Sequence, residues 1–487
     1  MRHQSELTPL VANGSPSLRS FTLRSITSRS LLIAASGVAI VLTFVFMLRE
    51  NSSFSSSTNL KGVTSKFDKF FCGLTSHETG YIKLPNKDDD HYFYWYVESQ
   101  SEPQKDPLVL WLTGGPGCSS MMALLAENGP CHVQPDLSTK ANPYSWNGQA
   151  NVIWLDQPTG VGFSYGPTVD YDSGELNVAE NIYWFLQEFF QKHPELSGRD
   201  FFVTGESYGG HYVPASASYI LKANMLRHLN LDAVYINLAG IAVGNGLTDP
   251  AVQFQHSVDM AFNSYNVSLL NDKAIEDMRK AQPVCRELIL KCQKNQTICA
   301  DAMEFCFGTQ EGPYYQSGRN PYDIRQLCAE DNVMNCFHFE HIVEYLNLPV
   351  TLKELGVDVH KSKPWRECDA TVAAGFALDE MLSSTEDVKL LLDAGVRVLI
   401  YAGDADLMCN WVGNQAWVMA LDWSGKEGFR NAPNRPLVTS VVQDAGRVRT
   451  FENLAFIRVF NSGHMVPMDQ PAVAFEMINK LFHDQDL

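Results

Sequence analysis

The chain has 487 residues, of which 45% are hydrophobic, 11% aromatic and 19% charged, with 33 Gly and 23 Pro. This composition excludes a disordered, collagen-like or coiled-coil chain and provides enough apolar residues for a large core. The formal charge of −18 argues against nucleic acid as a partner, since such affinity depends largely on Lys and Arg that neutralise phosphates.

The first segment with a clear pattern is the uncharged apolar run 31–48. It is about long enough for a helix that crosses a hydrocarbon core of ~30 Å. A cleaved signal peptide is the alternative, but its apolar core spans only ~7 to 15 residues and does not follow a long polar lead. We therefore predict a cytosolic tail at 1–30, a transmembrane signal anchor at 31–48 and a Ser-rich stalk at 49–70. The chain would then contact a membrane through this single N-terminal helix.

Beyond about residue 71, short apolar runs alternate with helical patterns, which is typical of an α/β sheet. Strands are expected at 91–97, 108–112, 151–155, 201–203, 238–243, 396–401 and 456–460. Helices are expected around 178–189, at 212–225 and from near 471 onward, where apolar residues recur at helical spacing. Residues 249–384 interrupt the alternation, so we expect them to be an insertion in a catalytic domain formed by 71–248 and 385–487.

Six of the eleven cysteines fall between Cys285 and Cys336. A metal site and a disulfide framework are the two interpretations, and the lack of paired Cys-x₂-Cys spacings favours disulfides. Disulfides imply an oxidising compartment, so the large C-terminal part is expected in a lumen. The triplets that begin at Asn51, Asn266 and Asn295 are then usable N-glycosylation acceptors.

The segment FFVTGESYGG, at 201–210, places Ser207 between two glycines, after an apolar strand and before a predicted helix. This is the context of a nucleophile elbow, in which a serine on a strained turn projects its hydroxyl above the sheet. The serine needs a histidine base and a carboxylate that orients the histidine, in the chain order Ser, Asp or Glu, His. Asp404 or Asp406, at the end of one predicted strand, and His464, after another, fit that order.

Five segments in one order resemble the serine carboxypeptidase family of the vacuolar and lysosomal type. They are WLTGGPGCSS at 111–120, GESYGGH at 205–211, NPYDIR at 320–325, YAGDADLMCNW at 401–411 and GHMVP at 463–467. The resemblance covers about 71–487 and implies an α/β-hydrolase fold with 249–384 as a disulfide-rich cap over the cleft. It makes Ser207 the nucleophile, His464 the general base and then acid, and Asp406 the residue that orients His464. The resemblance excludes Asp404 as the triad aspartate, because the family's aspartate stands three residues before a cysteine, here Cys409.

The resemblance further implies that the N–H groups of Gly115 and Tyr208 form the oxyanion hole. The family binds the free C-terminal carboxylate of its substrate with an Asn, the adjacent Gly backbone and two glutamates that share a proton. These places are taken here by Thr113, Gly114, Glu127 and Glu206. Thr in place of Asn is a departure from the family. Because two close carboxyls cannot both ionise cheaply, activity on peptides is expected to be favoured at acidic pH.

Disulfide pairs are also implied by the resemblance, namely Cys118 with Cys368, Cys285 with Cys306, Cys292 with Cys299, and Cys328 with Cys336. Cys72 and Cys131 have no assured match in the family and are left as a candidate pair. Cys409 then remains as a free thiol beside the S1 pocket.

The leading hypothesis is a serine-type carboxypeptidase, a hydrolase that releases C-terminal amino acids from peptides and proteins through an acyl-enzyme. The alternatives are an acyltransferase on the same scaffold, which Thr113 favours, and an inactive homologue that binds or protects another lumenal enzyme. No metal or organic cofactor is expected, and a homodimer remains open. The expected location is the lumen of a vacuole, lysosome or other endomembrane compartment, or outside the cell if the anchor is cleaved.

Overall fold

The computed structural model describes residues 72, 76–229, 232–328 and 336–487. The predicted tail, anchor and stalk at 1–70, together with Asn51, lie outside the described residues. Within the described part, no helix combines the length and the apolar character that crossing a membrane requires. The described residues all belong to one unit of the chain, Thr64–Leu487.

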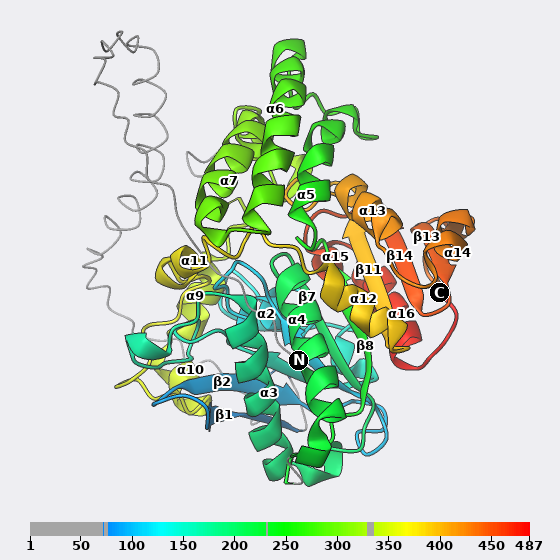
Figure 1. The fold of residues 1–487 in the computed structure, drawn as a ribbon. Coiled ribbons are helices and arrows are strands. Elements are labelled where there is room, and N and C mark those ends of the chain that lie inside the picture. Colours follow the sequence, from blue (N-terminus) through cyan, green and yellow to red (C-terminus); the bar gives the residue numbers. More distant parts are fainter. Residues whose placement is uncertain (1–71, 73–75, 230–231, 329–335) are drawn as a thin grey trace, which may run out of the picture. The chain divides into compact units, whose positions relative to one another are not determined.

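A mixed sheet of ten strands runs through this unit (Figure 1). In spatial order the strands are β1 (His77–Lys83), β2 (His91–Val97), β6 (Asn151–Leu155), β3 (Leu108–Leu112), β7 (Phe201–Glu206), β8 (Leu238–Gly244), β11 (Arg397–Gly403), β14 (Leu454–Val459), β13 (Gly446–Phe451) and β12 (Arg435–Leu437). The strands from β6 to β14 are parallel, and the pairs at both edges are antiparallel. The carboxyl ends of the parallel strands therefore meet at one edge of the sheet.

All seven predicted strands are present. Strands β2, β3 and β6 have the predicted bounds, and β7, β8, β11 and β14 differ from the prediction by up to three residues at an end. The sequence analysis missed β1, β12 and β13, which lie at or next to the edges of the sheet. Edge strands carry more polar residues, as in the HETGYIK of β1, so they lack the continuous apolar run that marks a central strand.

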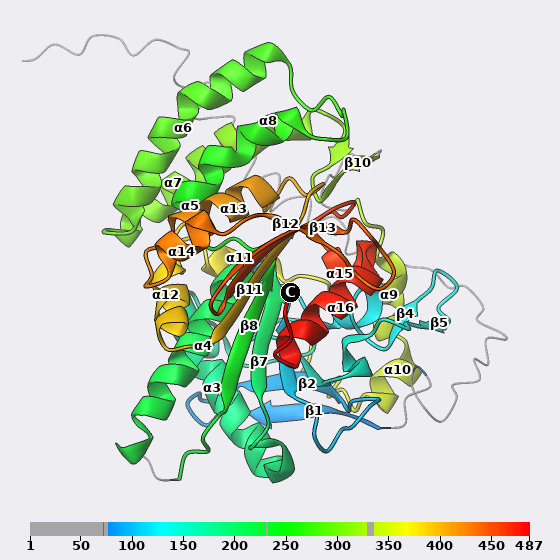
Figure 2. The ribbon, with the colours of Figure 1, turned by 90° about the vertical axis from the view of Figure 1, so that its right-hand side faces the viewer.

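Helices cover both faces of the sheet (Figure 2). Side chains of β3 alternate between the faces, since Leu110 belongs to one apolar cluster and Trp111 to the other. The first cluster includes residues of α3 (Glu175–Lys192) and α4 (Gly209–Met225), and the second includes residues of α2 (Met121–Ala126) and α16 (Pro471–Phe482). Full burial of one large apolar side chain stabilises the fold by roughly 1.5–3 kcal/mol, so this double-sided packing holds the central strands firmly.

Helices from the predicted insertion lie over the carboxyl ends of the parallel strands (Figures 1 and 2). They are α5 (Pro250–Gln253), α6 (Asp272–Cys292), α7 (Cys299–Cys306) and α8 (Gly312–Tyr315). The first turn of α6 is capped by Asn271, whose side chain accepts a hydrogen bond of 2.9 Å from the N–H of Ala274. This layer covers the end of the sheet at which open α/β folds place their sites.

Shorter elements complete the unit. The remaining helices are α9 (Glu340–Leu346), α10 (Pro349–Glu354), α11 (Ala370–Gly375), α12 (Thr385–Asp393), α13 (Trp411–Ala420), α14 (Lys426–Asn431) and α15 (Val466–Asp469). Two small antiparallel pairs join β4 (Cys131–Val133) to β5 (Thr139–Ala141) and β9 (Arg319–Asn320) to β10 (Asp323–Leu327).

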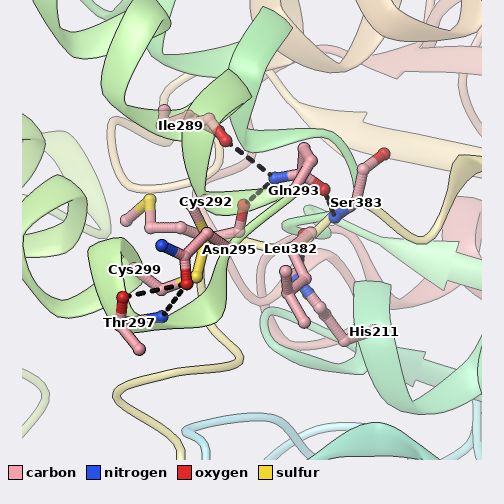
Figure 3. The surroundings of a disulfide bond; sticks show 10 residues. His211, Ile289, Cys292, Gln293, Asn295, Thr297, Cys299, Leu382 and Ser383 are labelled. Atoms are coloured by element: carbon pink, nitrogen blue, oxygen red, sulfur yellow. Dashed lines mark hydrogen bonds between the residues drawn. A yellow bond between two sulfur atoms is a disulfide. The ribbon is translucent and has the colours of Figure 1, made fainter. Parts of the chain in front are cut away.

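Five disulfides cross-link the chain. They join Cys118 to Cys368, Cys285 to Cys306, Cys292 to Cys299, Cys328 to Cys336, and also Cys72 to Cys131. The first four are the pairs that the family resemblance implies, and the fifth is the pair that the sequence left open. Figure 3 shows the Cys292–Cys299 bond where α6 ends and α7 begins, with exposed Asn295 in the turn between them.

Candidate active site

Ser207 occupies the sharp turn between β7 and α4. Its φ of 60° lies in the left-handed region, which costs a non-glycine residue on the order of 1–3 kcal/mol. Backbone bonds hold this conformation, because the Ser207 N–H donates to Gly244 (3.1 Å) and the Ser207 carbonyl accepts from Leu247 (3.0 Å). Gly205 is needed beside it, since a Cβ there would stand 2.3 Å from the carbonyl oxygen of Leu112. The turn therefore raises Ser207 above the carboxyl end of β7.

Asp406 and His464 come from the loops after β11 and β14 and meet in the buried interior. The Nδ1 of His464 lies 2.8 Å from Oδ2 of Asp406, and both residues are almost inaccessible to water. Asp406 also accepts hydrogen bonds from the side chain of Asn245 (2.8 Å) and from the N–H groups of Met408 (3.0 Å) and Cys409 (3.1 Å). These donors hold the carboxylate in one orientation. Because Nδ1 of the histidine contacts Asp406, its Nε2 is left to accept and donate a proton.

Asp404, the second candidate from the sequence, faces away from this pair. Its carboxylate accepts from Arg458 (2.9 Å), from the N–H of Asn461 (3.1 Å) and from the hydroxyl of Tyr265. A carboxylate held by an arginine and a backbone N–H is a structural anchor for its loop. The structure thus brings Asp406, and not Asp404, to His464.

The loop that carries His464 is held by Tyr322. The N–H of His464 donates to the Tyr322 carbonyl (2.8 Å), and the two rings pack edge to face at 5.1 Å. Among the described residues, no hydrogen bond joins Nε2 of His464 to the hydroxyl of Ser207. Such a bond commonly tightens only when substrate binds, so its geometry in the free enzyme does not decide the role of either residue.

Gly114 brings the loop after β3 against the nucleophile. A Cβ on Gly114 would stand 2.3 Å from the N atom of Tyr208 and 2.8 Å from the Cβ of Ser207. The next residue, Gly115, has a φ of +112°, which favours glycine. The backbones at Gly114–Gly115 and Tyr208 therefore converge beside Ser207, as a pair of N–H donors for an oxyanion requires.

We expect Gly114→Ala to lower kcat/KM by about 10²–10³-fold, the usual cost of losing one oxyanion donor. The added methyl cannot fit against the Tyr208 backbone, so one of the two chain segments must move away from Ser207. Steady-state kinetics and a thermal melt of the same sample measure the effect. Gly198→Ala is the matched control, because a Cβ at Gly198 meets no atom within 4 Å. Equal activity of the two variants would contradict the predicted close approach.

Glu127 and Glu206 form a buried pair of carboxyl groups. Oε2 of each residue has no hydrogen-bond partner among the described residues, so a proton shared between the two carboxyls would satisfy both. Burial raises the pKa of both carboxyls, and the charge of Glu127 raises the pKa of Glu206 further. The two residues lie next to the triad, since the charges of His464 and Asp406 act on Glu127 and Glu206 respectively.

Thr113 is buried at the end of β3, where the family resemblance predicts carboxylate binding. Its Oγ1 accepts a hydrogen bond of 2.9 Å from the indole N–H of Trp111. Its own N–H donates to the hydroxyl of Ser120 (3.1 Å). With Trp111 as donor, the hydroxyl proton of Thr113 is left to donate to an anion, so this residue retains one of the functions of an asparagine amide.

Cys409 is the free cysteine among the described residues, and it is buried. Burial and the negative charges of neighbouring carboxyls, first that of Asp406, raise the pKa of its thiol. A thiol with a raised pKa is a poor nucleophile, so Cys409 is not expected to act as the nucleophile in place of Ser207.

The described residues contain no group of three or more His, Cys, Asp or Glu side chains that could hold a metal ion.

Asn245 is the residue of this site that the sequence analysis missed. It follows β8 in the sequence Gly244-Asn245-Gly246, has a positive φ of 40°, and holds Asp406 through its amide. A second bond, from the N–H of Gly403 to its Oδ1 (2.9 Å), ties it to the end of β11. A polar residue between two glycines at the end of a predicted strand is the signal that could have revealed it.

The comparisons with known proteins agree with this geometry. The family model described as "Serine carboxypeptidase" matches residues 72–484. "Carboxypeptidase Y" of Candida albicans is 41% identical over 408 residues, which cover 82% of this chain and 72% of that protein. "Serine carboxypeptidase-like" of Oryza sativa subsp. japonica is 40% identical over 409 residues, which cover 82% of this chain and 91% of that protein.

Among solved structures, the fold is similar to KEX1(delta)p, a prohormone-processing carboxypeptidase from Saccharomyces cerevisiae. The TM-score is 0.74 at 26% sequence identity, and the match covers 84% of this chain and 91% of that one. The similarity supports an α/β-hydrolase-like fold with a large mixed sheet and disulfides. From the family match, the relatives and the arrangement of Ser207, Asp406 and His464, we conclude that the chain belongs to the serine carboxypeptidase family.

Proposed function

We propose that this serine carboxypeptidase removes C-terminal amino acids from peptides and proteins through an acyl-enzyme, with Ser207, His464 and Asp406 as its catalytic triad. The observation that carries the proposal is the buried Asp406–His464 pair at 2.8 Å, on the same end of the sheet as the strained Ser207 and the Glu127–Glu206 pair. A triad supplies acyl transfer, and a receptor for a free carboxylate restricts that transfer to the end of a chain.

In the first half of the reaction, Oγ of Ser207 attacks the last peptide carbonyl while Nε2 of His464 takes its proton. The N–H groups of Gly115 and Tyr208 bind the oxyanion that forms. When the C–N bond breaks, His464 returns the proton to the leaving amino acid. Water then attacks the acyl-enzyme with His464 again as base, which releases the shortened peptide and restores the Ser207 hydroxyl.

The free carboxylate of the substrate would be bound by Thr113, Gly114, Glu127 and Glu206. The Thr113 hydroxyl and the Gly114 backbone offer donors, and the protonated member of the glutamate pair offers another. This arrangement favours acidic pH, because each proton that leaves the pair adds a negative charge beside the substrate carboxylate. The same requirement argues against the acyltransferase alternative, since Glu127 and Glu206 are both present and in contact.

We also propose that the enzyme works in a lumen of the secretory pathway. Ten of the eleven cysteines are in disulfides, and Asn266 and Asn295 are exposed as glycan acceptors should be. The run at 31–48 would anchor it as a single-pass membrane protein, with 1–30 as cytosolic tail and 49–70 as stalk. The residues at 249–384 would serve as the cap over the catalytic domain formed by 71–248 and 385–487.

Two measurements test the reaction. Incubation with an N-blocked dipeptide is expected to release the free C-terminal amino acid, whereas transfer of the acyl group to an alcohol would identify an acyltransferase. A fluorophosphonate probe is expected to label the enzyme and to lose all labelling in Ser207→Ala, because the probe reacts only with an activated serine. Labelling that persists in Ser207→Ala would assign the nucleophile to another residue, and absent labelling of the unaltered enzyme would point to an inactive homologue.

A further inference from the structure

Two carboxyl groups whose charges act on Cys409 have no role in the reaction just described. Glu311 ends the π-helical turn Phe307–Glu311, and Glu380 lies in the segment that precedes α12. Turns of π type are rare and often mark functional sites. Neither carboxylate forms an ion pair with a Lys, Arg or His of the described residues, although a lone charge withdrawn from water is costly.

Glu311 is held close to the triad aspartate. Its side chain is 5% exposed, and Oε2 has no hydrogen-bond partner among the described residues. Three residues later, Tyr314 belongs to the same apolar cluster as Ala405 and Leu407, which stand on either side of Asp406. Burial raises the pKa of Glu311 well above its ordinary value, and the charges of Glu380 and Asp406 add to the rise. Glu311 is therefore a buried carboxyl with one oxygen that lacks a hydrogen-bond partner, and the charges that act on it are those of other acids.

Glu380 sits in a segment that is fixed on both sides. Before it, Asp379 accepts a hydrogen bond of 2.7 Å from the hydroxyl of Tyr208, the residue after the nucleophile. After it, the backbone of the next three residues is held by the side chains of His211 and Gln293 (Figure 3). Withdrawal from water raises the pKa of Glu380 to about 7, and the charge of Asp379 contributes to the rise. The segment that carries Glu380 is thus bound to Tyr208 and His211 at the start of α4 and to Gln293 at the end of α6.

The charges of both carboxyls act on the thiol of Cys409. The charges that act on its thiol are those of Asp406, Glu311, Glu380 and Glu206, in decreasing order. Neither Glu311 nor Glu380 is among the groups that act on the Glu127–Glu206 pair. Two pairs of acids therefore lie in this part of the fold, Glu127 with Glu206 at the proposed carboxylate receptor and Glu311 with Glu380 near Cys409, and the charge of Glu206 acts on Cys409 as well.

We propose that Glu311 and Glu380 line the pocket for the substrate residue on the acyl side of the scissile bond and make this pocket selective for Lys and Arg. The proposal rests on the proposed function, because the Glu127–Glu206 pair fixes where the C-terminal residue lies. With that residue held there, the preceding side chain extends past Ser207 toward Cys409. A lysine ammonium or an arginine guanidinium then supplies the positive charge that the described residues around Glu311 and Glu380 lack.

A cation fits this pocket better than an anion. The charges of Glu380 and Asp406 act on Glu311, and Oε2 of Glu311 has no hydrogen-bond partner among the described residues, so this oxygen is able to accept a hydrogen bond from a cation. At the Glu127–Glu206 pair, Thr113 and Gly114 offer further donors to the substrate carboxylate. At Glu311, by contrast, the neighbouring groups whose charges act on it are other acids. An acidic substrate side chain would therefore meet like charges, which disfavour its binding.

The test compares three N-blocked dipeptides that share a C-terminal alanine and carry lysine, norleucine or glutamate before it. Norleucine has nearly the length of lysine without the charge. At one pH, kcat/KM of the unaltered enzyme is expected to be roughly 10- to 100-fold higher for lysine than for norleucine, with glutamate lowest, as for loss of one partner of a desolvated charge pair. In Glu311→Gln/Glu380→Gln the ratio of lysine to norleucine is expected to fall toward one.

Glu304→Gln, at an exposed position of α7, is the matched control and is expected to leave all three values unchanged. Glu380→Lys is the second variant, and it is expected to raise the glutamate substrate above the lysine substrate. Equal values for lysine and norleucine in the unaltered enzyme, or a ratio that survives in the double variant, would overturn the proposal and leave the carboxypeptidase function intact. Release of alanine from none of the dipeptides would overturn the proposed function instead.

Discussion

Asp406→Asn is expected to lower kcat by roughly 10³–10⁴-fold with little change in KM, because the residue orients the base and does not touch substrate. Oδ1 of Asp406 accepts from Met408, and Oδ2 accepts from Asn245, Cys409 and His464. Whichever way the amide of asparagine is turned, its NH₂ group faces another donor. The imidazolium of His464 also loses the negative charge that stabilises it in the transition state.

Asp404→Asn is the matched control for this variant, since it makes the same chemical change two residues away. It removes one charge from the Asp404–Arg458 pair and is expected to lower the melting temperature while kcat stays within about twofold, because structural charge pairs affect the stability of the fold. Stopped-flow or steady-state rates and thermal melts of both variants provide the comparison. A large loss of kcat in Asp404→Asn, or near-normal kcat in Asp406→Asn, would contradict the assignment of the two residues.

Glu206→Gln is expected to flatten the pH dependence of KM for peptides. In the unaltered enzyme, the raised pKa values of Glu127 and Glu206 keep a proton on the pair at acidic pH. Above the apparent pKa of the pair, substrate binding must restore that proton, so KM should rise about tenfold per pH unit. Glutamine donates its N–H at every pH, so the variant should bind well at acidic pH and keep its affinity as the pH rises.

The same substitution should change stability in a defined direction. A carboxyl whose pKa is raised in the folded state binds more protons there than in the unfolded state. Stability therefore falls as the pH rises from the unfolded pKa through the folded one. Glu206→Gln removes this loss, so its melting temperature should exceed that of the unaltered enzyme at neutral pH and approach it in acid. A KM profile that still rises as steeply in the variant would refute the shared-proton account.

The elements that one local pattern marks could be predicted from the sequence. Central strands such as β3 and β6 are buried on both faces, so their continuous apolar runs are visible in the sequence. The turn at Ser207 was also visible, because its positive φ requires small neighbours that the motif displays. The edge strand β12 was not, since three residues that include a proline carry no strand pattern.

Groups that meet only through tertiary packing could not be found in this way. Asp404 and Asp406 are equivalent in spacing, and without help from a known family only their partners in the fold separate them, which are Arg458 for Asp404 and His464 for Asp406. Glu311 and Glu380 are further examples, because nothing in the local sequence distinguishes them from exposed surface acids, whereas the fold buries Glu311 and half-buries Glu380. Burial of a charge depends on the whole fold and leaves no local signal in the sequence.

The Cys118–Cys368 disulfide has a consequence for the chain as a whole. It joins two positions 250 residues apart, and the interval contains Ser207 and the helices α5 to α10. If one peptide bond is cut within 249–367, Ser207 is on the first fragment and both Asp406 and His464 are on the second. The disulfide keeps the two fragments in one covalent molecule. In such a cleaved molecule the triad residues would remain covalently linked, and only reduction of this disulfide after cleavage would remove the link between the nucleophile and its base.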